Sequence, residues 1–582
     1  AIDPQTPATL HAGTYGGGVF SMQQVQSSFS ISHIEVTQAI QDQSNNVPLI
    51  AGKPTFVRVY VDCGSGCASL PKVTGVLRGY GPSGELPGSP RMSVNPTITA
   101  YHGSWQDQRN DLGRTLNFTL PPEWSTGAIT LVAEVNGATL SEEVTFQSVQ
   151  TLNVIYVPIR YKGQSPDISR IERGLWFASR VYPTSQIVYV PGTTLDWDRC
   201  VKEDLLCPFW KLNSELLLNE LTTRYRLVNA YAYVYGWLPG GTRDGGTSDP
   251  TFLGGAGIAA FGDDHPEEGP RAFAHEVGHL LERRHTETGE CARWARDPLT
   301  DWPYDNAKIQ DYGLDGFGFG WLASSSSAVK SPANTYDYMS YCGFLAQGNV
   351  WTSPWTYTHI YSETLRTQAA AVAVQALSAP QPYFIASGLV YTDDTATLDP
   401  IWVITSDAAP QNPPEGTGYC LEAQDTSGIA LASHCFDLIF MDYETGKPTD
   451  VDGFNLMLPY PAGVARIVLK KDTQELAVQP VSAHAPTVTV LSPNGDETWS
   501  ATGTYTVTWT ASDLDGDPLT YSVLYSPDGS KWLPIGFTTT QTQLTVNAAE
   551  LAGGSGARMQ VLASDGVNTT ADESDAPFTV GR

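Results

Sequence analysis

The chain has 582 residues, of which 61 are acidic and 33 are basic, and its net charge at pH 7 is −28. Nucleic acids and anionic membranes attract basic surfaces, so this charge argues against both as partners and favours a soluble, self-repelling protein. The length exceeds what one hydrophobic core supports and predicts about four domains. No apolar run approaches the roughly 20 residues of a membrane-spanning helix, so we expect no membrane span.

Hydrophobic period and turn residues divide the chain into segments. Residues 1–27 are rich in Gly, Ser and Gln, and we expect a loose arm there. Residues 28–150 alternate apolar and polar positions between Gly and Pro turns, which predicts a β-sandwich. Residues 378–485 are strand-like again and predict a β-rich domain. Residues 486–582 have the spacing of an immunoglobulin or fibronectin-III-like sandwich.

Residues 151–377 have a different pattern, in which strands alternate with helices. This alternation predicts a mixed α/β layer rather than another sandwich. Strands are expected at residues 152–161, 185–192 and 230–238, and helices at residues 167–182 and 210–227. The expected architecture is therefore multidomain, with an α/β (α+β) unit flanked by β-sandwich modules.

The cysteines indicate an oxidising compartment. Six of the eight fall into local pairs, and two remain: Cys63 and Cys67, Cys200 and Cys207, Cys420 and Cys435, then Cys291 and Cys342. An even count without a CxxC…CxxC metal pattern suits disulfides. The chain starts without a basic or apolar leader, so we expect a mature secreted chain whose leader has been removed. The alternative is a cytosolic protein with buried thiols.

The stretch HEVGHLLERRH, from His275 to His285, lies in the α/β segment. Pro270 precedes it at the first turn of a predicted helix, where proline is favoured. At about 100° per residue, an apolar stripe forms on one side, and His275 and His279 lie one turn apart on the other. The stripe consists of Phe273, Val277, Leu280 and Leu281. We expect this helix to be fixed to the core and to present both imidazoles to a cleft.

Two imidazoles one helical turn apart, with a glutamate beside them, suit a zinc site. Catalytic zinc takes three protein ligands and a water, whose pKa falls to about 7. Glu276 lies beside the two histidines and is the candidate general base for that water. The same pattern also occurs on solvated polar helices, so the signals around it decide between the two interpretations.

Three such signals accompany the helix: His285, the downstream stretch NTYDYMSYC, and an upstream Gly/Ala-rich segment. With them the chain resembles the metzincin clan of zinc endopeptidases, whose pattern is HExxHxxGxxH followed by a methionine turn. The resemblance covers about residues 151–375. It implies that His275, His279 and His285 bind Zn²⁺ and that Glu276 is the general base.

The resemblance also gives roles to two residues of NTYDYMSYC. It implies that Met339 forms the floor of the site and that Tyr341 binds the metal or stabilises the oxyanion. Ordinary core packing is the alternative for both side chains, because methionine fills irregular gaps and a buried tyrosine needs only a partner for its hydroxyl.

The segment GGAGIAAFG, residues 254–262, precedes the motif. Small side chains let a substrate backbone approach and pair as a further strand. By resemblance this is the edge strand above the zinc helix, and a glycine-rich loop is the alternative. The candidate substrate-binding residues are Gly255, Ala256, Gly257, Ile258 and Ala259.

Glu282 stands where metzincins usually have glycine. If the helix continued, His285 would lie about 9 Å beyond His279 along the axis, too far for one zinc ion. We therefore predict that the helix ends within a residue or two of Glu282, in a left-handed turn that costs roughly 1–2 kcal/mol and returns His285 to the metal. The alternatives are a turn at Arg283 or Arg284, and Glu287 or Glu290 as the third ligand.

Two further predictions concern a disulfide and a second cation. By resemblance, the segments of Cys291 and Cys342 converge beneath the zinc, so a disulfide there would close a loop of about 50 residues and contribute roughly 2–4 kcal/mol. The acidic stretches at residues 449–455 and 512–518 could bind Ca²⁺. Neither completes the EF-hand pattern, and acidic β-turns are the alternative.

We therefore expect a secreted zinc endopeptidase that hydrolyses internal bonds of a protein or glycoprotein substrate. One alternative is a mucin-type protease whose β modules bind glycans. Another is a non-catalytic adhesin with a decayed protease domain. The intact Glu276 argues against decay, which usually removes the base.

Overall fold

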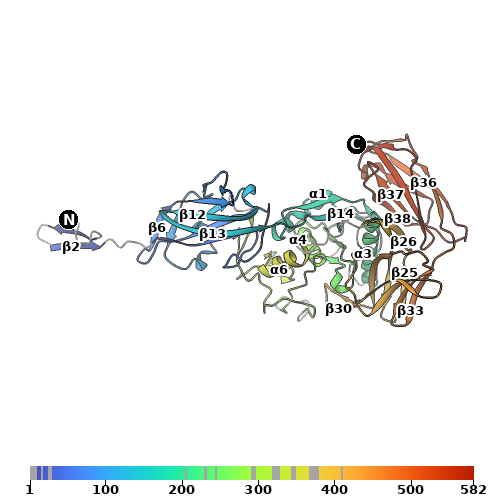
Figure 1. Cartoon of the computed structure of the whole chain (residues 1–582), viewed down its shortest axis with the longest axis horizontal. Helices are drawn as coiled ribbons and strands as arrows, with labels where there is room; N and C mark the ends of the chain where they lie inside the picture. Colours follow the sequence, from blue (N-terminus) through green and yellow to red (C-terminus); the bar gives the residue numbers. More distant parts are fainter. Residues whose placement is uncertain are drawn as a thin grey trace.

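The computed structural model describes residues 9–14, 18–23, 29–202, 206–228, 232–242, 245–286, 288–289, 297–316, 328–342, 349–365, 379–407 and 411–582. The molecule is elongated, with a β-sandwich, a central α/β unit and two further β units following one another in chain order (Figure 1). The segment predicted to be an N-terminal arm contains two short strands. Strands β1 (Thr9–Thr14) and β2 (Gly18–Gln23) pair as an antiparallel hairpin.

The N-terminal unit is the predicted β-sandwich. Its two sheets enclose one core, in which Val59, Leu131 and Trp124 are fully buried. Strand β12 shows the expected alternation of buried and partly exposed positions along its length. One sheet contains β3 (Ser30–Thr37), β5 (Phe56–Asp62), β6 (Ser69–Val73), β10 (Ile98–Tyr101) and β11 (Thr115–Thr119). The other contains β4 (Leu49–Ile50), β7 (Gly75–Gly81), β8 (Gly84–Glu85), β9 (Arg91–Met92), β12 (Gly127–Val135) and β13 (Ala138–Gln147).

The central unit is a mixed sheet with helices on both faces, as the alternating pattern predicts. Its strand order is β15-β14-β17-β19-β18, and every pairing is parallel except that of β18 with β19. Side chains along β17 alternate between two cores, because Tyr235 packs towards helix α4 and Val234 towards helix α3. The strands are β14 (Leu152–Tyr161), β15 (Ile187–Pro191), β16 (Leu195–Trp197), β17 (Tyr233–Leu238), β18 (Gly246–Ser248) and β19 (Ala259–Asp263).

The helices of this unit follow the sequence with one exception. Helices α3 (Trp210–Arg226) and α4 (Gly269–Leu280) form where they are predicted. The single helix expected at residues 167–182 is instead three short pieces: α1 (Ile168–Ile171), η4 (Gly174–Trp176) and α2 (Ala178–Val181). The break falls at Gly174, where a Cβ atom would lie 2.6 Å from the Trp237 ring. Glycine weakens a helix and here allows that ring to pack against the backbone.

The edge-strand prediction for residues 254–262 is wrong. Only Ala259 onwards is strand, and β19 lies between β17 and β18, so β18 forms the edge. The preceding loop folds onto Asp249, whose carboxylate accepts a hydrogen bond from the Ala256 amide at 2.9 Å. A Cβ atom on Gly255 would lie 1.6 Å from that carboxylate. Gly255, Ala256, Gly257 and Ile258 are therefore buried around a carboxylate rather than laid out as an open edge.

The last part of the central unit consists of short elements below helix α4. Helix α6 begins at Pro354, with the Ser353 side chain accepting from the Thr356 amide at its N-cap. The elements are β20 (Gly313–Leu314), β21 (Val329–Lys330), β22 (Tyr336–Asp337), β23 (Val350–Trp351), α6 (Pro354–His359) and the π-helix η7 (Ile360–Leu365).

Two β units complete the chain. The first has two four-stranded sheets: β24 (Gln381–Tyr391), β25 (Ala396–Leu398), β26 (Trp402–Ser406) and β31 (Val451–Pro459), then β27 (Tyr419–Gln424), β28 (Ala430–Phe436), β32 (Arg466–Lys471) and β33 (Gln474–Pro480). A separate hairpin joins β29 (Met441–Asp442) and β30 (Lys447–Pro448). The second unit has sheets of β34 (Thr487–Ser492), β36 (Thr504–Ser512) and β39 (Gln543–Asn547), and of β35 (Thr498–Trp499), β37 (Thr520–Ser526), β38 (Leu533–Thr539), β40 (Gly554–Ser564), β41 (Thr569–Glu573) and β42 (Phe578–Val580).

The first of these β units is docked on helix α3. Arg226 donates to Asn455 Oδ1 at 2.7 Å, and Asn455 donates to Thr223 at 2.7 Å, across a buried contact. Asn219 donates to the Gly388 carbonyl at 3.1 Å. Buried polar groups require such partners, so this interface fixes how the β-rich unit meets the central unit.

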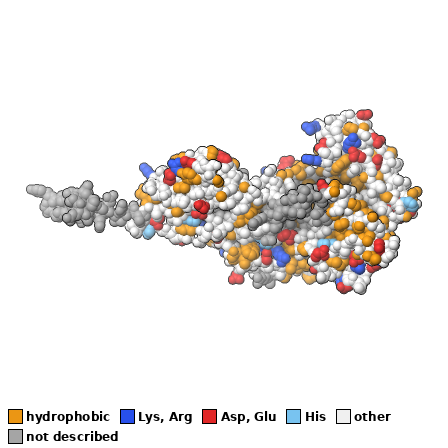
Figure 2. All heavy atoms as spheres, in the orientation of Figure 1, with side chains coloured by type: hydrophobic (Ala, Val, Ile, Leu, Met, Phe, Trp, Pro, Cys, Tyr) orange, Lys and Arg blue, Asp and Glu red, His pale blue; other side chains and the backbone are white. Residues whose placement is uncertain are grey.

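Three disulfides match the predicted local pairs: Cys63–Cys67, Cys200–Cys207 and Cys420–Cys435. Cys342 is also disulfide-bonded, whereas Cys291, its predicted partner, lies outside the described residues. Within the described part of the chain, every helix is too short or too polar to cross a bilayer. On the face in Figure 2, acidic and basic side chains are interspersed over the surface.

Candidate metal centre

Helix α4 is built as its sequence predicts. Pro270 lies in the first turn, and the side chains of Phe273 and Val277 are fully buried against the sheet. His275 and His279 project from the other side of the helix, where the His275 side chain is 12% exposed and that of His279 is fully buried. The apolar face thus fixes the position of both imidazoles.

The predicted end of the helix at Glu282 is confirmed. Helix α4 ends at Leu280, and Glu282 has a φ of 61°, in the left-handed region. The Glu282 amide donates to the His279 carbonyl at 2.9 Å, and the Arg283 amide donates to the Gly278 carbonyl at 2.9 Å. These two bonds define a Schellman motif, whose left-handed position usually holds glycine.

Side-chain contacts stabilise this turn, although its left-handed residue is a glutamate and not a glycine. The Thr251 hydroxyl donates to the Glu282 carboxylate at 2.5 Å, and burial raises the pKa of that carboxyl. Arg283 is fully buried and pairs with Asp301. The turn therefore has partners on both sides that offset the strain of a left-handed glutamate.

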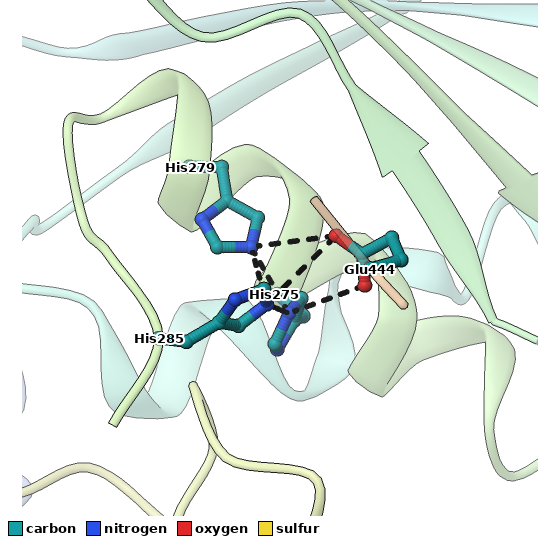
Figure 3. Close-up of side chains that lie close together, drawn as sticks. All are labelled: His275, His279, His285 and Glu444. Carbon is teal, nitrogen blue, oxygen red and sulfur yellow. Dashed lines mark hydrogen bonds and ion pairs between the residues drawn. The ribbon is translucent and has the colours of Figure 1, made fainter. Parts of the chain in front are cut away.

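The turn returns His285 to the two helix histidines (Figure 3). The Nε2 atoms of His275, His279 and His285 lie 3.1 Å from one another in all three pairs. The centre of such a triangle is about 1.8 Å from each nitrogen, which is close to the 2.0–2.1 Å of zinc–imidazole bonds. The third-ligand rivals Glu287 and Glu290 lie outside the described residues.

Each imidazole is also fixed through its other nitrogen. The Nδ1 atom of His275 lies 2.9 Å from the Tyr338 carbonyl oxygen. The Nδ1 atom of His279 lies 2.6 Å from the Arg283 carbonyl oxygen. A carbonyl only accepts, so both Nδ1 atoms carry the proton. His285 Nδ1 lies 3.2 Å from the buried carboxylate of Asp297. Such partners set the tautomer and leave Nε2 to bind a metal.

The three imidazoles are neutral in this environment. Burial lowers the pKa of His275 to about 4. Burial also lowers the pKa values of His279 and His285 well below the ordinary value, and the neighbouring histidines lower them further. Three neutral rings then direct Nε2 lone pairs at one point, and an ion at that point removes their mutual repulsion. The donor set therefore fits a metal ion.

Met339 packs against helix α4. A Cβ atom on Gly278 would be 2.7 Å from the Met339 sulfur, so the sulfur contacts the helix backbone between the two histidines. The Met339 carbonyl accepts from the Thr286 amide at 3.2 Å, and its amide donates to Asp337 at 2.9 Å. The backbone of Met339 thus supports the segment that carries His285.

Glu276 is almost fully buried on helix α4, and its carboxylate faces strand β18. The Ser248 hydroxyl donates to Glu276 Oε2 at 2.9 Å. A Cβ atom on Gly246 would lie 2.4 Å from the Glu276 side chain, so glycine lets the carboxylate lie against the edge strand. No sequence pattern marked Gly246 or Ser248, because the contact depends on how β18 pairs with β19.

Tyr341 and an unforeseen residue, Glu444, complete the cluster. The Tyr341 hydroxyl lies 3.0 Å from His285 Nε2 and donates to Glu444 Oε2 at 2.9 Å. Burial raises the pKa of Tyr341 well above its ordinary value, and the charges of Glu444 and Glu276 add to this. The ligand atoms of the three histidines and Glu444 lie within 4.8 Å of one another and could hold a metal ion.

The acidic stretches predicted for calcium differ from each other. In residues 512–518, carboxylate oxygens of Asp513, Asp515 and Asp517 lie within 4.8 Å of one another and could hold a cation. In residues 449–455, Asp452 is instead partly buried at the docking interface, where desolvation and the charge of Glu215 raise its pKa.

Comparisons with known proteins leave the family open. No family model matches the chain, and no curated protein matches it significantly. The geometry of the metal centre is therefore the basis for a function.

Proposed function

We propose that the chain is a zinc-dependent endopeptidase of the metzincin type, with His275, His279 and His285 as ligands. The observation that supports this most is the convergence of three neutral Nε2 atoms at 3.1 Å, each with its Nδ1 atom held by a separate acceptor. Zinc accepts such imidazoles readily. Glu276, which follows His275 on helix α4, would be the general base that a hydrolase needs.

Bound zinc would supply a Lewis acid and a water of lowered pKa. Glu276 would accept a proton from that water and pass it to the leaving amine, while Ser248 keeps its carboxylate in place. Tyr341, protonated at neutral pH because burial raises its pKa, would donate a hydrogen bond to the developing oxyanion. These roles use only side chains that lie within the cluster or beside it.

The substrate would be an extended segment of a protein. Strand β18 is the sheet edge beside helix α4 and contacts Glu276 through Gly246 and Ser248. A peptide that pairs along this edge would bring its backbone past the base. The substrate-binding role predicted for residues 255–259 therefore moves to β18 in this proposal. A glycoprotein substrate stays a prediction from the sequence.

Cleavage of unfolded casein tests the proposal. We expect activity that a chelator abolishes and zinc restores. The Glu276→Gln variant should keep stoichiometric zinc and lose roughly 10²–10⁴-fold in rate. Wild-type activity in that variant would refute the role of Glu276, and a zinc-loaded wild type that cleaves no unfolded protein would refute the proposed function.

Glu444 favours a second candidate, a structural metal site that joins two domains of a non-catalytic protein. Structural zinc sites are closed by four protein ligands, whereas catalytic sites keep one position for water. The carboxylate of Glu444 lies 3.7–3.9 Å from the three Nε2 atoms. Under this candidate, no condition or variant would produce proteolysis.

A further inference from the structure

A hairpin of the β-rich unit closes over the metal centre. Strands β29 and β30 flank a turn with Glu444 near its tip. Glu444 Oε1 lies 3.7 Å from His279 Nε2 and 3.8 Å from His285 Nε2, and Oε2 lies 3.9 Å from His275 Nε2 (Figure 3). The carboxylate is nearly equidistant from the three nitrogens, so it faces the point on which they converge.

Aromatic contacts anchor the turn there. The Tyr443 ring stacks on His285, with centroids 4.4 Å apart and an interplanar angle of 23°. The His285 amide donates to the Tyr443 hydroxyl at 3.3 Å. Tyr443 is only 5% exposed and also contacts Phe252 at a centroid distance of 5.4 Å. The Tyr341 hydroxyl also donates a hydrogen bond to the Glu444 carboxylate. The turn therefore makes specific contacts with residues of the metal centre.

We propose that Glu444 is the fourth metal ligand of a closed resting state, and that the 441–448 hairpin must withdraw before a substrate reaches the metal. This inference rests on the proposed function, because it concerns access to the same centre. A carboxylate oxygen is a zinc ligand as good as the water that catalysis requires. While Glu444 is bound, Glu276 has no metal-bound water to deprotonate.

Hydrogen bonds within the hairpin would let residues 441–448 move as one unit. The Asp442 carboxylate accepts from the Thr445 amide at 2.8 Å, and the Asp442 carbonyl accepts from the Gly446 amide at 2.8 Å. Within the described residues, β29 pairs only with β30, as a two-stranded sheet of its own. Withdrawal would therefore break the contacts of Tyr443 and Glu444 but leave the larger sheets paired.

Cobalt(II) substitution and acetohydroxamate binding test this in the full-length chain. Glu444→Ala and Glu444→Gln remove the carboxylate, and Lys447→Ala changes an exposed residue of the same hairpin as a control. If the closed arrangement outnumbers the open one by about ten to one, the wild type should bind acetohydroxamate about 10-fold more weakly than either Glu444 variant. The visible cobalt spectrum should change in both Glu444 variants and match the wild type in Lys447→Ala.

The outcomes separate this inference from the proposed function. Unchanged cobalt spectra and equal acetohydroxamate affinities in the wild type and both Glu444 variants would overturn the inference, even if the protein cleaves casein. Changed spectra and tighter binding would support it, even if no form of the protein cleaves casein and the proposed function fails. If the protein is a protease, casein cleavage should be faster in Glu444→Ala than in the wild type.

Discussion

The left-handed glutamate at the end of helix α4 gives a prediction whose size follows from the structure. Both Schellman bonds use backbone atoms, so Glu282→Gly and Glu282→Ala keep them, and both lose the bond from Thr251. Alanine keeps a left-handed strain of about 1–2 kcal/mol, which glycine relieves. Glycine also makes the unfolded chain more flexible than alanine does, which lowers the stability of the glycine variant by about 0.4–1 kcal/mol. The glycine variant should therefore be more stable than the alanine variant by about 1 kcal/mol.

Hydrogen exchange at the Arg283 amide measures this locally. That amide donates to the Gly278 carbonyl at 2.9 Å, and this hydrogen bond is the second of the Schellman motif. A difference of about 1 kcal/mol corresponds to about fivefold in protection, so Arg283 should exchange about fivefold more slowly in Glu282→Gly than in Glu282→Ala. Metal-free protein is the right sample, because a bound ion would hold His285 in both variants. Equal protection, or slower exchange in the alanine variant, would refute the argument.

Two other predictions concern metal affinity and pH. Asp297→Asn should weaken metal binding about 10–100-fold, because its carboxylate holds His285 Nδ1 at 3.2 Å. Competition with a chromophoric chelator measures this, and an unchanged dissociation constant would contradict it. Burial lowers the pKa of Lys53 to about 7, below the ordinary 10.5, so between these values the unfolded chain binds more protons and stability rises with pH. The free energy of unfolding of the wild type minus that of Lys53→Met should therefore increase from pH 7 to pH 10, and a constant difference would count against it.

The sequence predicted those parts of the fold and of the site that depend on local pattern. The apolar stripe of helix α4 and the spacing of its histidines place two rings on one side, and the distance limit for one ion places the end of the helix near Glu282. The local disulfides could also be predicted from the sequence, because few residues separate Cys63 from Cys67 or Cys200 from Cys207.

What the sequence did not predict depends on contacts between distant segments. Glu444 reaches the histidines only because the β-rich unit docks on helix α3, and an ordinary acidic turn carries no sign of that. The edge strand was misplaced for a similar reason. A Gly/Ala-rich segment suits an edge, but Asp249 fills the space above Gly255, and β18 covers the strand that follows. The break at Gly174 depends likewise on the ring of Trp237.

The docking of the β-rich unit also bears on where the chain can be cut. One hydrophobic cluster contains Leu227 at the end of helix α3, Trp402 and Met457 of the β-rich unit, and Leu524 and Leu562 of the last unit. Three segments that look like separate modules in the sequence therefore share apolar surface that none of them covers alone. A chain shortened to its first 377 residues would expose Leu227 and the buried polar face of α3 to water. The smallest soluble fragment that contains the metal centre should accordingly extend to the C-terminal sandwich.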